Sequence, residues 1–95
     1  MNPDKDRLAG KIAIVSAAGR GIGQGIAKCL AAAGATVIVN SYGEETTANT
    51  VDQILASGGT AIGMPGDITS AEVILDLVAR TIEEFGKIDI LVNNL

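Results

Sequence analysis

The 95-residue sequence contains no histidine, no tryptophan and a single cysteine, Cys29. Without histidine or a second cysteine, neither a Cys/His zinc site nor an internal disulfide can form, so we expect no metal site. The absence of histidine also leaves the serines without a partner base for nucleophilic catalysis. Cys29 falls in a predicted helix, where we expect it to be a small buried apolar residue.

Aromatic residues are almost absent, since Tyr42 and Phe85 are the only two. The seven Lys and Arg residues are scattered, and the net charge is −4, so the sequence offers neither a basic patch nor a stacking platform for nucleic acid. No apolar stretch approaches the roughly 20 residues that span a bilayer. Residues 1–7 form a polar extension that is too charged for a signal peptide. We therefore expect an acidic cytoplasmic protein with no nucleic-acid or membrane partner.

Hydrophobic residues make up 47% of the chain, a fraction typical of globular proteins. Four short apolar runs, residues 11–16, 36–40, 60–64 and 88–93, read as parallel strands that helices cover on both faces. Three helical segments separate them, the second over residues 44–57. In the third, Thr69 and Glu72 resemble a capping box and Gly86 a stop signal. Its apolar stripe is the clearest of the three and consists of Ile74, Leu77, Val78, Thr81, Ile82 and Phe85.

This alternation predicts an α/β fold of the Rossmann type, with three layers and helices on both faces of a parallel sheet. Right-handed crossovers give the strand order 3-2-1-4. We interpret residues 1–95 as one partial dinucleotide-binding domain. Ligands of such sheets bind where the strand order reverses, at the carboxyl ends of strands one and four.

A glycine-rich turn follows the first strand and opens the first helix. It consists of Ser16, Ala17, Ala18, Gly19, Arg20, Gly21, Ile22 and Gly23. Small residues let the backbone approach a pyrophosphate, and the first N–H groups of the helix point at the anion. Simple close packing of helix on strand is the alternative for Gly21 and Gly23, but the strand-to-helix context favours phosphate binding.

The turn resembles the Thr-Gly-x-x-x-Gly-Ile-Gly segment of the short-chain dehydrogenases/reductases. Ser16 takes the place of the threonine and Ala17 that of the first glycine, where its methyl group could crowd a tight turn or a position of positive φ. Residues 66–68 resemble that family's adenine-contacting segment, residues 85–92 its entry into strand four, and residues 93–94 the start of its Asn-Asn-Ala-Gly motif. Within the family, the resemblance is to the 3-oxoacyl-[acyl-carrier-protein] reductase or glucose dehydrogenase type.

The resemblance implies a bound dinucleotide. Asp67 and Ile68 would contact the adenine, although Asp67 could merely shape the turn. Asn93 could touch the cofactor or brace the end of the sheet. Contacts to the rest of the cofactor are expected from the turn, at Ser16, Ala18, Gly19, Arg20, Gly21, Ile22 and Gly23.

The end of the second strand bears on the choice between NAD and NADP. An acidic residue there typically accepts the ribose 2′-hydroxyl of NAD, whereas a nearby arginine accommodates the 2′-phosphate of NADP. The sequence has Asn40, Ser41 and Tyr42 at this point, and Arg20 precedes Gly21. We therefore expect Arg20, Asn40 and Ser41 to favour NADP(H) over NAD(H). Glu44 and Glu45 count against this preference, because they follow closely and could repel the 2′-phosphate.

The resemblance also implies an oxidoreductase that acts on CH–OH or carbonyl groups through a serine, a Tyr-x-x-x-Lys pair and an asparagine. These lie beyond the Asn-Asn motif, and Tyr42 has Thr46 four residues on, so we assign no catalytic residue. We expect a cofactor-binding half that is inactive alone. Two alternatives remain open: a stand-alone nucleotide-binding or sensor module, and a structural fragment that assembles through the exposed apolar edge of strand four.

Overall fold

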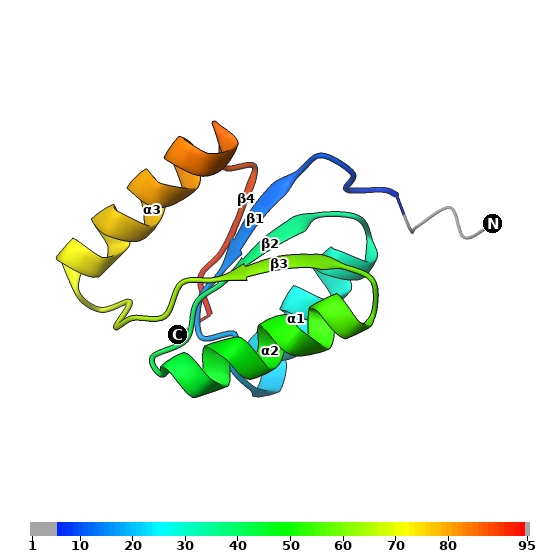
Figure 1. The fold of residues 1–95 in the computed structure, drawn as a ribbon. Coiled ribbons are helices and arrows are strands. Elements are labelled where there is room, and N and C mark those ends of the chain that lie inside the picture. Colours follow the sequence, from blue (N-terminus) through cyan, green and yellow to red (C-terminus); the bar gives the residue numbers. More distant parts are fainter. Residues whose placement is uncertain (1–5, 95) are drawn as a thin grey trace.

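The computed structural model describes residues 6–94 and shows strands alternating with helices along the chain (Figure 1). Residues 1–5 of the polar extension, and Leu95, lie outside the described residues. The alternation expected from the sequence is confirmed. In chain order the elements are β1 (Ile12–Val15), α1 (Gly21–Ala32), β2 (Thr36–Val39), α2 (Glu44–Ala56), β3 (Thr60–Gly63), α3 (Ala71–Phe85) and β4 (Ile90–Val92).

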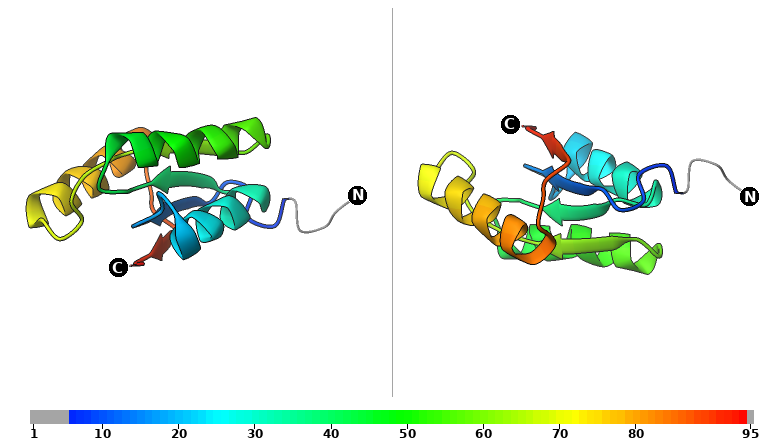
Figure 2. Two further views of the ribbon diagram at one scale, coloured as in Figure 1. Left: turned by 90° about the horizontal axis from the view of Figure 1, so that it is seen from below. Right: turned by 90° about the horizontal axis from the view of Figure 1, so that it is seen from above.

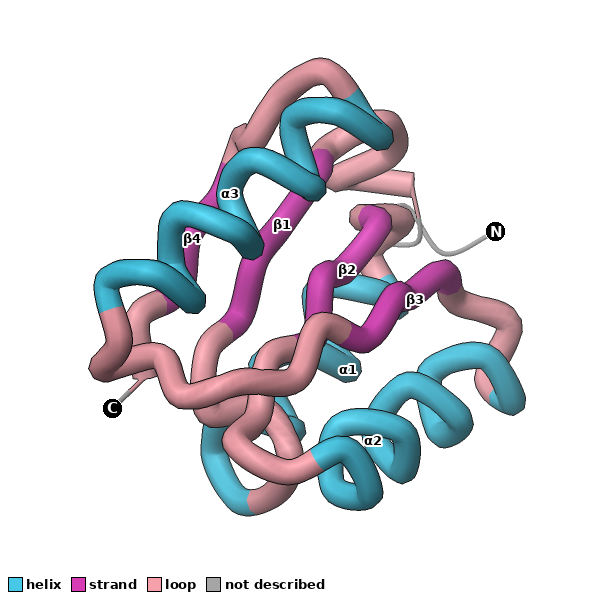
Figure 3. Tube along the Cα trace, turned by 60° about the vertical axis from the view of Figure 1, so that its left-hand side comes forward, coloured by secondary structure: helices cyan, strands magenta, loops and turns pink. Residues whose placement is uncertain are grey.

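The four strands form one parallel sheet in the order β3-β2-β1-β4, as the sequence predicts. Ile12 of β1 lies opposite Thr36 of β2, and Ala13 lies opposite Ile90 of β4. The loops that follow the strands gather at one edge of the sheet, at the lower left of Figure 3. This edge contains the point at which the strand order reverses, between β1 and β4.

Helices α1 and α2 pack on one face of the sheet and α3 on the other (Figure 2). Successive side chains of β1 point to opposite faces, so Ala13 and Val15 join the core under α1 and α2, whereas Ile12 and Ile14 join the core under α3. The molecule is thus a three-layer Rossmann-type unit. No helix within residues 6–94 has the length and apolar character needed to cross a membrane.

The start of α3 differs from the expected capping box. Ser70 is the N-cap, and its hydroxyl accepts a hydrogen bond from the backbone N–H of Val73. Thr69 does not cap the helix, and its hydroxyl instead donates to the Asp67 carboxylate at 2.6 Å. The capping-box prediction for Thr69 and Glu72 is therefore wrong. The predicted stop is confirmed at Gly86, which has a left-handed conformation with φ of 79°.

Cys29 is exposed, so the expectation of a buried cysteine is also wrong. The buried positions of α1 are Gly23, Ala27 and Ala31, which recur every four residues. Cys29 is two residues from both Ala27 and Ala31, and it therefore lies on the opposite side of the helix.

Within residues 6–94 the face under α3 is only partly covered, because α3 is the one helix that packs there. Leu77 and Thr81 are buried, but 40% of Ile74 and 44% of Ile82 remain exposed. Leu91, in the edge strand β4, is 68% exposed. A pocket of about 230 Å³ separates α3 from β4, with Ile74, Val78 and Leu91 among its lining residues. The apolar edge expected at strand four is thus a feature of the fold.

Candidate functional site

The turn from β1 to α1 has backbone conformations that favour residues with small side chains. Gly21 has φ of 61°, and Ala17 has φ of 50°. Ala17 is the only residue other than glycine with positive φ in the described part of the chain. The methyl group that departs from the family's glycine therefore occupies a left-handed position, which is strained for an L-residue with a Cβ atom.

Two further glycines allow close approach of other backbone and side-chain atoms. A Cβ atom at Gly23 would collide with the Ala17 carbonyl oxygen and lie 2.6 Å from Nδ2 of Asn94. A Cβ atom at Gly19 would collide with the Ser41 hydroxyl and lie 2.9 Å from Cβ of Thr46. These glycines bring the turn against the end of β4 on one side and the β2–α2 connection on the other.

Side chains from α1, from α2 and from the segment after β4 hold successive carbonyl groups of the turn. Asn94 Nδ2 donates to the Ala17 oxygen at 3.5 Å, Thr50 Oγ1 to the Ala18 oxygen at 2.9 Å, and Gln24 Nε2 to the Gly19 oxygen at 3.4 Å. Thr50 is fully buried, and Gln24 also donates to its hydroxyl at 3.1 Å. These bonds give the three carbonyl groups of the turn partners within the protein.

The N-terminus of α1 is suited to an anionic ligand. Its N-cap, Arg20, has an extended backbone and makes no side-chain capping bond, and the first turn of the helix contains no acidic residue. In contrast, α2 has Glu44 and Glu45 in its first turn, and α3 is capped by Ser70. The first N–H groups of a helix lack intrahelical partners and sit at the positive end of its dipole. The Ile22 side chain in this turn of α1 is 76% exposed.

Ser16 joins the end of β1 to the segment that follows β4. Its hydroxyl accepts from the Asn94 N–H at 2.9 Å, and it can donate to the Val92 carbonyl oxygen at 3.3 Å or to Oδ1 of Asn93 at 3.4 Å. Ser16 is itself buried. The glycine-rich turn and residues 93–94 therefore meet at the carboxyl ends of β1 and β4, as the predicted topology requires.

The connection after β2 places Asn40 and Ser41 differently. Asn40 is buried, and its side-chain Nδ2 donates to the backbone oxygens of Met64 and Gly66. Ser41 is partly exposed, and its hydroxyl lies 2.7 Å from that of Thr46. Arg20 is exposed in the glycine-rich turn. It directly follows Gly19, which packs against Ser41.

Asp67 lies in the connection from β3 to α3. Its Oδ1 accepts from the Thr69 hydroxyl at 2.6 Å and from the Thr69 backbone N–H at 2.9 Å. These two hydrogen bonds, the hydroxyl bond first, lower the pKa of the Asp67 carboxyl group below its ordinary value. Asp67 is thus an anionic side chain with a fixed orientation, while the adjacent Ile68 packs against the core under α3.

The expected cofactor residues of the turn, of residues 40–41 and of residues 67–68, together with Asn93, all follow a strand at the same edge of the sheet. Sequence reasoning missed Gln24 and Thr50, which donate hydrogen bonds to carbonyl oxygens of the turn. A signal was available for Thr50, since Thr47, Thr50 and Ile54 are the buried residues of α2 and share one helical face. Within residues 6–94 no three histidine, cysteine or acidic side chains gather where they could hold a metal ion.

Residues 11–95 match the short chain dehydrogenase family. The chain is 44% identical to the 7alpha-hydroxysteroid dehydrogenase of Escherichia coli over 94 residues, which cover 99% of this chain and 37% of that protein. It is 42% identical to versicolorin reductase 1 of Aspergillus parasiticus, covering 96% of this chain and 35% of that protein.

A solved structure of 7alpha-hydroxysteroid dehydrogenase, complexed with NADH and 7-oxo glycochenodeoxycholic acid, superposes with a TM-score of 0.89 at 44% identity. The match covers 99% of this chain and 37% of that structure. The chain thus spans little more than a third of the length of these relatives. Its match to the family nevertheless includes every element of the fold and the whole glycine-rich turn. The chain belongs to the short chain dehydrogenase family.

Proposed function

We propose that this chain is the cofactor-binding part of a short-chain oxidoreductase, and that it binds NADP(H) in preference to NAD(H). The observation that carries the proposal is the turn before α1, whose carbonyls are bound by the protein and whose following helix has no side-chain cap. This arrangement suits a pyrophosphate, because the free N–H groups and the helix dipole both favour an anion. The NADH in the related structure supports a dinucleotide.

The preference for NADP(H) rests on the surroundings of Ser41. Gly19 packs against this serine, so the exposed Arg20 belongs to the same part of the surface. A guanidinium group can donate two hydrogen bonds to a phosphate, and residues 40–42 contain no carboxylate that would repel it. Glu44 and Glu45 instead lie in the first turn of α2, where they complement the dipole of that helix.

A cofactor titration tests the proposal. Tryptophan is absent from the chain, so the fluorescence of NADPH and NADH can be followed without indole emission. We expect tighter binding of NADPH than of NADH, and a selective loss of NADPH affinity of about tenfold or more in Arg20→Gln. The matched control is Arg80→Gln, which removes the same charge from an exposed ion pair with Asp76 on α3. Equal affinities for the two cofactors in the unmodified chain would contradict the preference, and binding of neither would contradict the function.

Turnover is not expected from residues 6–94 alone, because they include no Tyr-x-x-x-Lys pair. The assembling fragment remains a second candidate, favoured by the exposure of Leu91 on an edge strand. Size-exclusion chromatography combined with the titration separates the two. A monomer that binds NADPH would contradict assembly, and a dimer or larger species without binding would contradict the cofactor proposal.

A further inference from the structure

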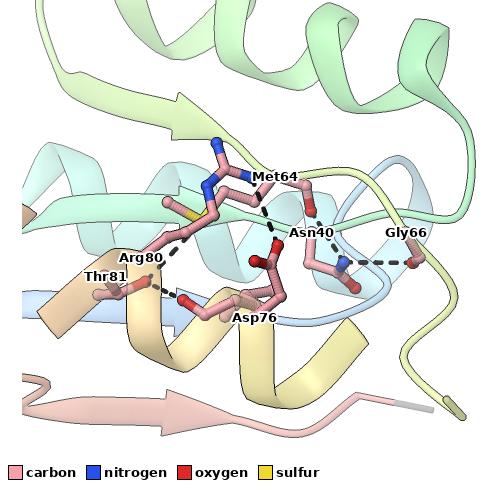
Figure 4. Close-up of polar contacts among 7 residues, drawn as sticks. Asn40, Met64, Gly66, Asp76, Arg80 and Thr81 are labelled. Atoms are coloured by element: carbon pink, nitrogen blue, oxygen red, sulfur yellow. Dashed lines mark hydrogen bonds and ion pairs between the residues drawn. The ribbon is translucent and has the colours of Figure 1, made fainter. Parts of the chain in front are cut away.

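Asn40 lies at the carboxyl end of β2, where a contact with the cofactor ribose is expected from the sequence. Its side chain instead turns into the protein, toward the connection between β3 and α3 (Figure 4). Only 1% of the residue is exposed. Nδ2 donates to the Met64 carbonyl oxygen at 3.0 Å and to the Gly66 carbonyl oxygen at 3.3 Å. Both hydrogens of the amide group are thus used within the protein.

The backbone of Asn40 contacts the other side of the site. Its carbonyl oxygen accepts from the Ala18 N–H at 2.8 Å, within the glycine-rich turn, and its N–H donates to the Val15 oxygen at 3.0 Å. One buried residue is therefore hydrogen-bonded to the turn that faces the proposed pyrophosphate and to the loop that leads to Asp67.

Gly66 is held on both sides, immediately before Asp67. Its N–H donates to the Ser41 carbonyl oxygen at 2.9 Å, and its own carbonyl accepts from Asn40. Its φ of 155° lies at the edge of the range that favours glycine. The Asp67 carboxylate is then fixed by its two hydrogen bonds from Thr69. The position of Asp67 relative to the glycine-rich turn consequently depends on the Asn40 amide together with the backbone bond between Gly66 and Ser41.

Few side chains could replace this amide. Two backbone carbonyls face it, so the position requires two N–H donors in a buried site. Serine and threonine supply one donor, and an ionised aspartate supplies none and would place its charge against two carbonyl oxygens. Leaving a buried carbonyl without its donor is costly.

We infer that Asn40 is a positioning residue of the dinucleotide site and not a cofactor contact. It sets the position of the Asp67 loop relative to the glycine-rich turn, and discrimination between NADP(H) and NAD(H) belongs to Arg20 and Ser41. The inference rests on the proposed function for its effect on affinity. Its structural part can be tested without any cofactor.

The first test compares Asn40→Ser with Ser41→Ala by amide hydrogen exchange and carboxyl NMR. In Asn40→Ser we expect the Gly66 and Thr69 amides to exchange at least tenfold faster and the pKa of Asp67 to move toward its ordinary value. Ser41→Ala leaves the Ser41 backbone carbonyl in place, so Gly66 should stay protected. Unchanged exchange and an unchanged Asp67 pKa in Asn40→Ser would overturn the inference.

The second test measures the affinities of the same variants for NADPH and NADH. Asn40→Ser should weaken both by a similar factor of about ten, whereas Ser41→Ala should lower the NADPH preference. A changed preference in Asn40→Ser with normal Gly66 protection would make Asn40 a direct contact and overturn the inference. If the unmodified chain binds neither cofactor, the proposed function fails while the exchange comparison still decides the positioning role.

A measurement on the unmodified chain covers the case in which Asn40→Ser does not fold. Two hydrogen bonds within the protein should slow the exchange of the Asn40 side-chain NH₂ protons at least tenfold relative to those of a partly exposed amide such as Gln53. Exchange as fast as that of Gln53 would overturn the inference.

Discussion

The Ser16 hydroxyl accepts a hydrogen bond from the backbone N–H of Asn94 at 2.9 Å, across 78 positions of the chain. This bond ties the end of β1 to the end of the edge strand β4. Ser16 can also donate to the Val92 carbonyl or to Asn93. One buried hydroxyl therefore joins the two strand ends that lie next to the glycine-rich turn.

Replacing this hydroxyl should destabilise the fold. We expect Ser16→Ala to lower the free energy of unfolding by about 1–3 kcal/mol, because it leaves the partly buried Asn94 N–H without its partner. Urea denaturation measures the change. Ser57→Ala removes an exposed serine hydroxyl that bonds only the Gln53 carbonyl, and it should cost no more than about 0.5 kcal/mol. Equal losses in the two variants would show that the Ser16 bonds contribute nothing specific.

Two glycines of α1 should respond in opposite ways to alanine. Gly23→Ala places a methyl group against the Ala17 carbonyl and Asn94, so we expect lower stability and at least a tenfold loss of NADPH affinity. A Cβ atom at Gly25 meets nothing within 4 Å, and Gly25→Ala should stabilise the helix by about 0.5–1 kcal/mol. Thermal denaturation and NADPH titration give both results. A Gly23→Ala protein that binds normally would refute the close approach.

Ala17 and Ala18 are adjacent but should also differ. Ala17→Gly relieves a left-handed conformation that costs about 1 kcal/mol, and the greater freedom of glycine in the unfolded chain offsets part of that gain. We expect a change between zero and about 1 kcal/mol in the stabilising direction. Ala18 is fully buried in the core, so Ala18→Gly should destabilise by about 1 kcal/mol or more. Equal destabilisation by both would show that Ala17 is not strained.

Asp89 should make stability depend on acid pH. Its Oδ2 accepts from the Ile12 N–H at 2.8 Å, and this bond, with a smaller contribution from Lys87, lowers the pKa of Asp89 below 3.8. A lowered pKa in the folded state stabilises the protein above the ordinary pKa, and the contribution is lost as the pH falls through the lowered value. Asp89→Asn should therefore flatten the stability curve below pH 3.8.

The charge control for this experiment is Asp76→Asn, at an exposed ion pair on α3. Urea midpoints measured across the acid range compare the variants. If the urea midpoint of Asp89→Asn falls with acid pH as it does in the unmodified chain, the bond between Asp89 and Ile12 is not the cause of the pH dependence.

The β4 edge predicts self-association of this chain at high protein concentration, because within residues 6–94 no strand pairs with the outer backbone groups of β4. Sedimentation velocity of Leu91→Lys should show less association than the unmodified chain, since a lysine on an edge strand disfavours pairing. Leu55→Lys is the matched control, because Leu55 is 51% exposed. It belongs to α2, which packs on the other face of the sheet and is not part of the β4 edge. A monomer at every concentration in the unmodified chain would contradict this expectation.

The sequence is sufficient to predict the topology because each strand and helix carries its own local signal. Strand order follows from handed crossovers, and the glycine-rich turn from its spacing. Side-chain direction is harder to predict, as Asn40 shows: its neighbours in sequence do not indicate that two carbonyls 24 and 26 residues away will face it. Thr69 likewise bonds Asp67 instead of capping α3, since two nearby hydroxyls compete for one helix start. The exposure of Cys29 could have been deduced from the spacing of the buried alanines in α1.

The most direct test of the central claim is the response of backbone amide NMR signals to NADPH. Binding at the proposed site should shift the signals of residues 19–23 and of Ser41 and leave those of residues 28–32, at the far end of α1, in place. Saturation of these shifts with a single dissociation constant is the predicted result. Folded protein whose signals in residues 19–23 do not move at millimolar NADPH would contradict the account.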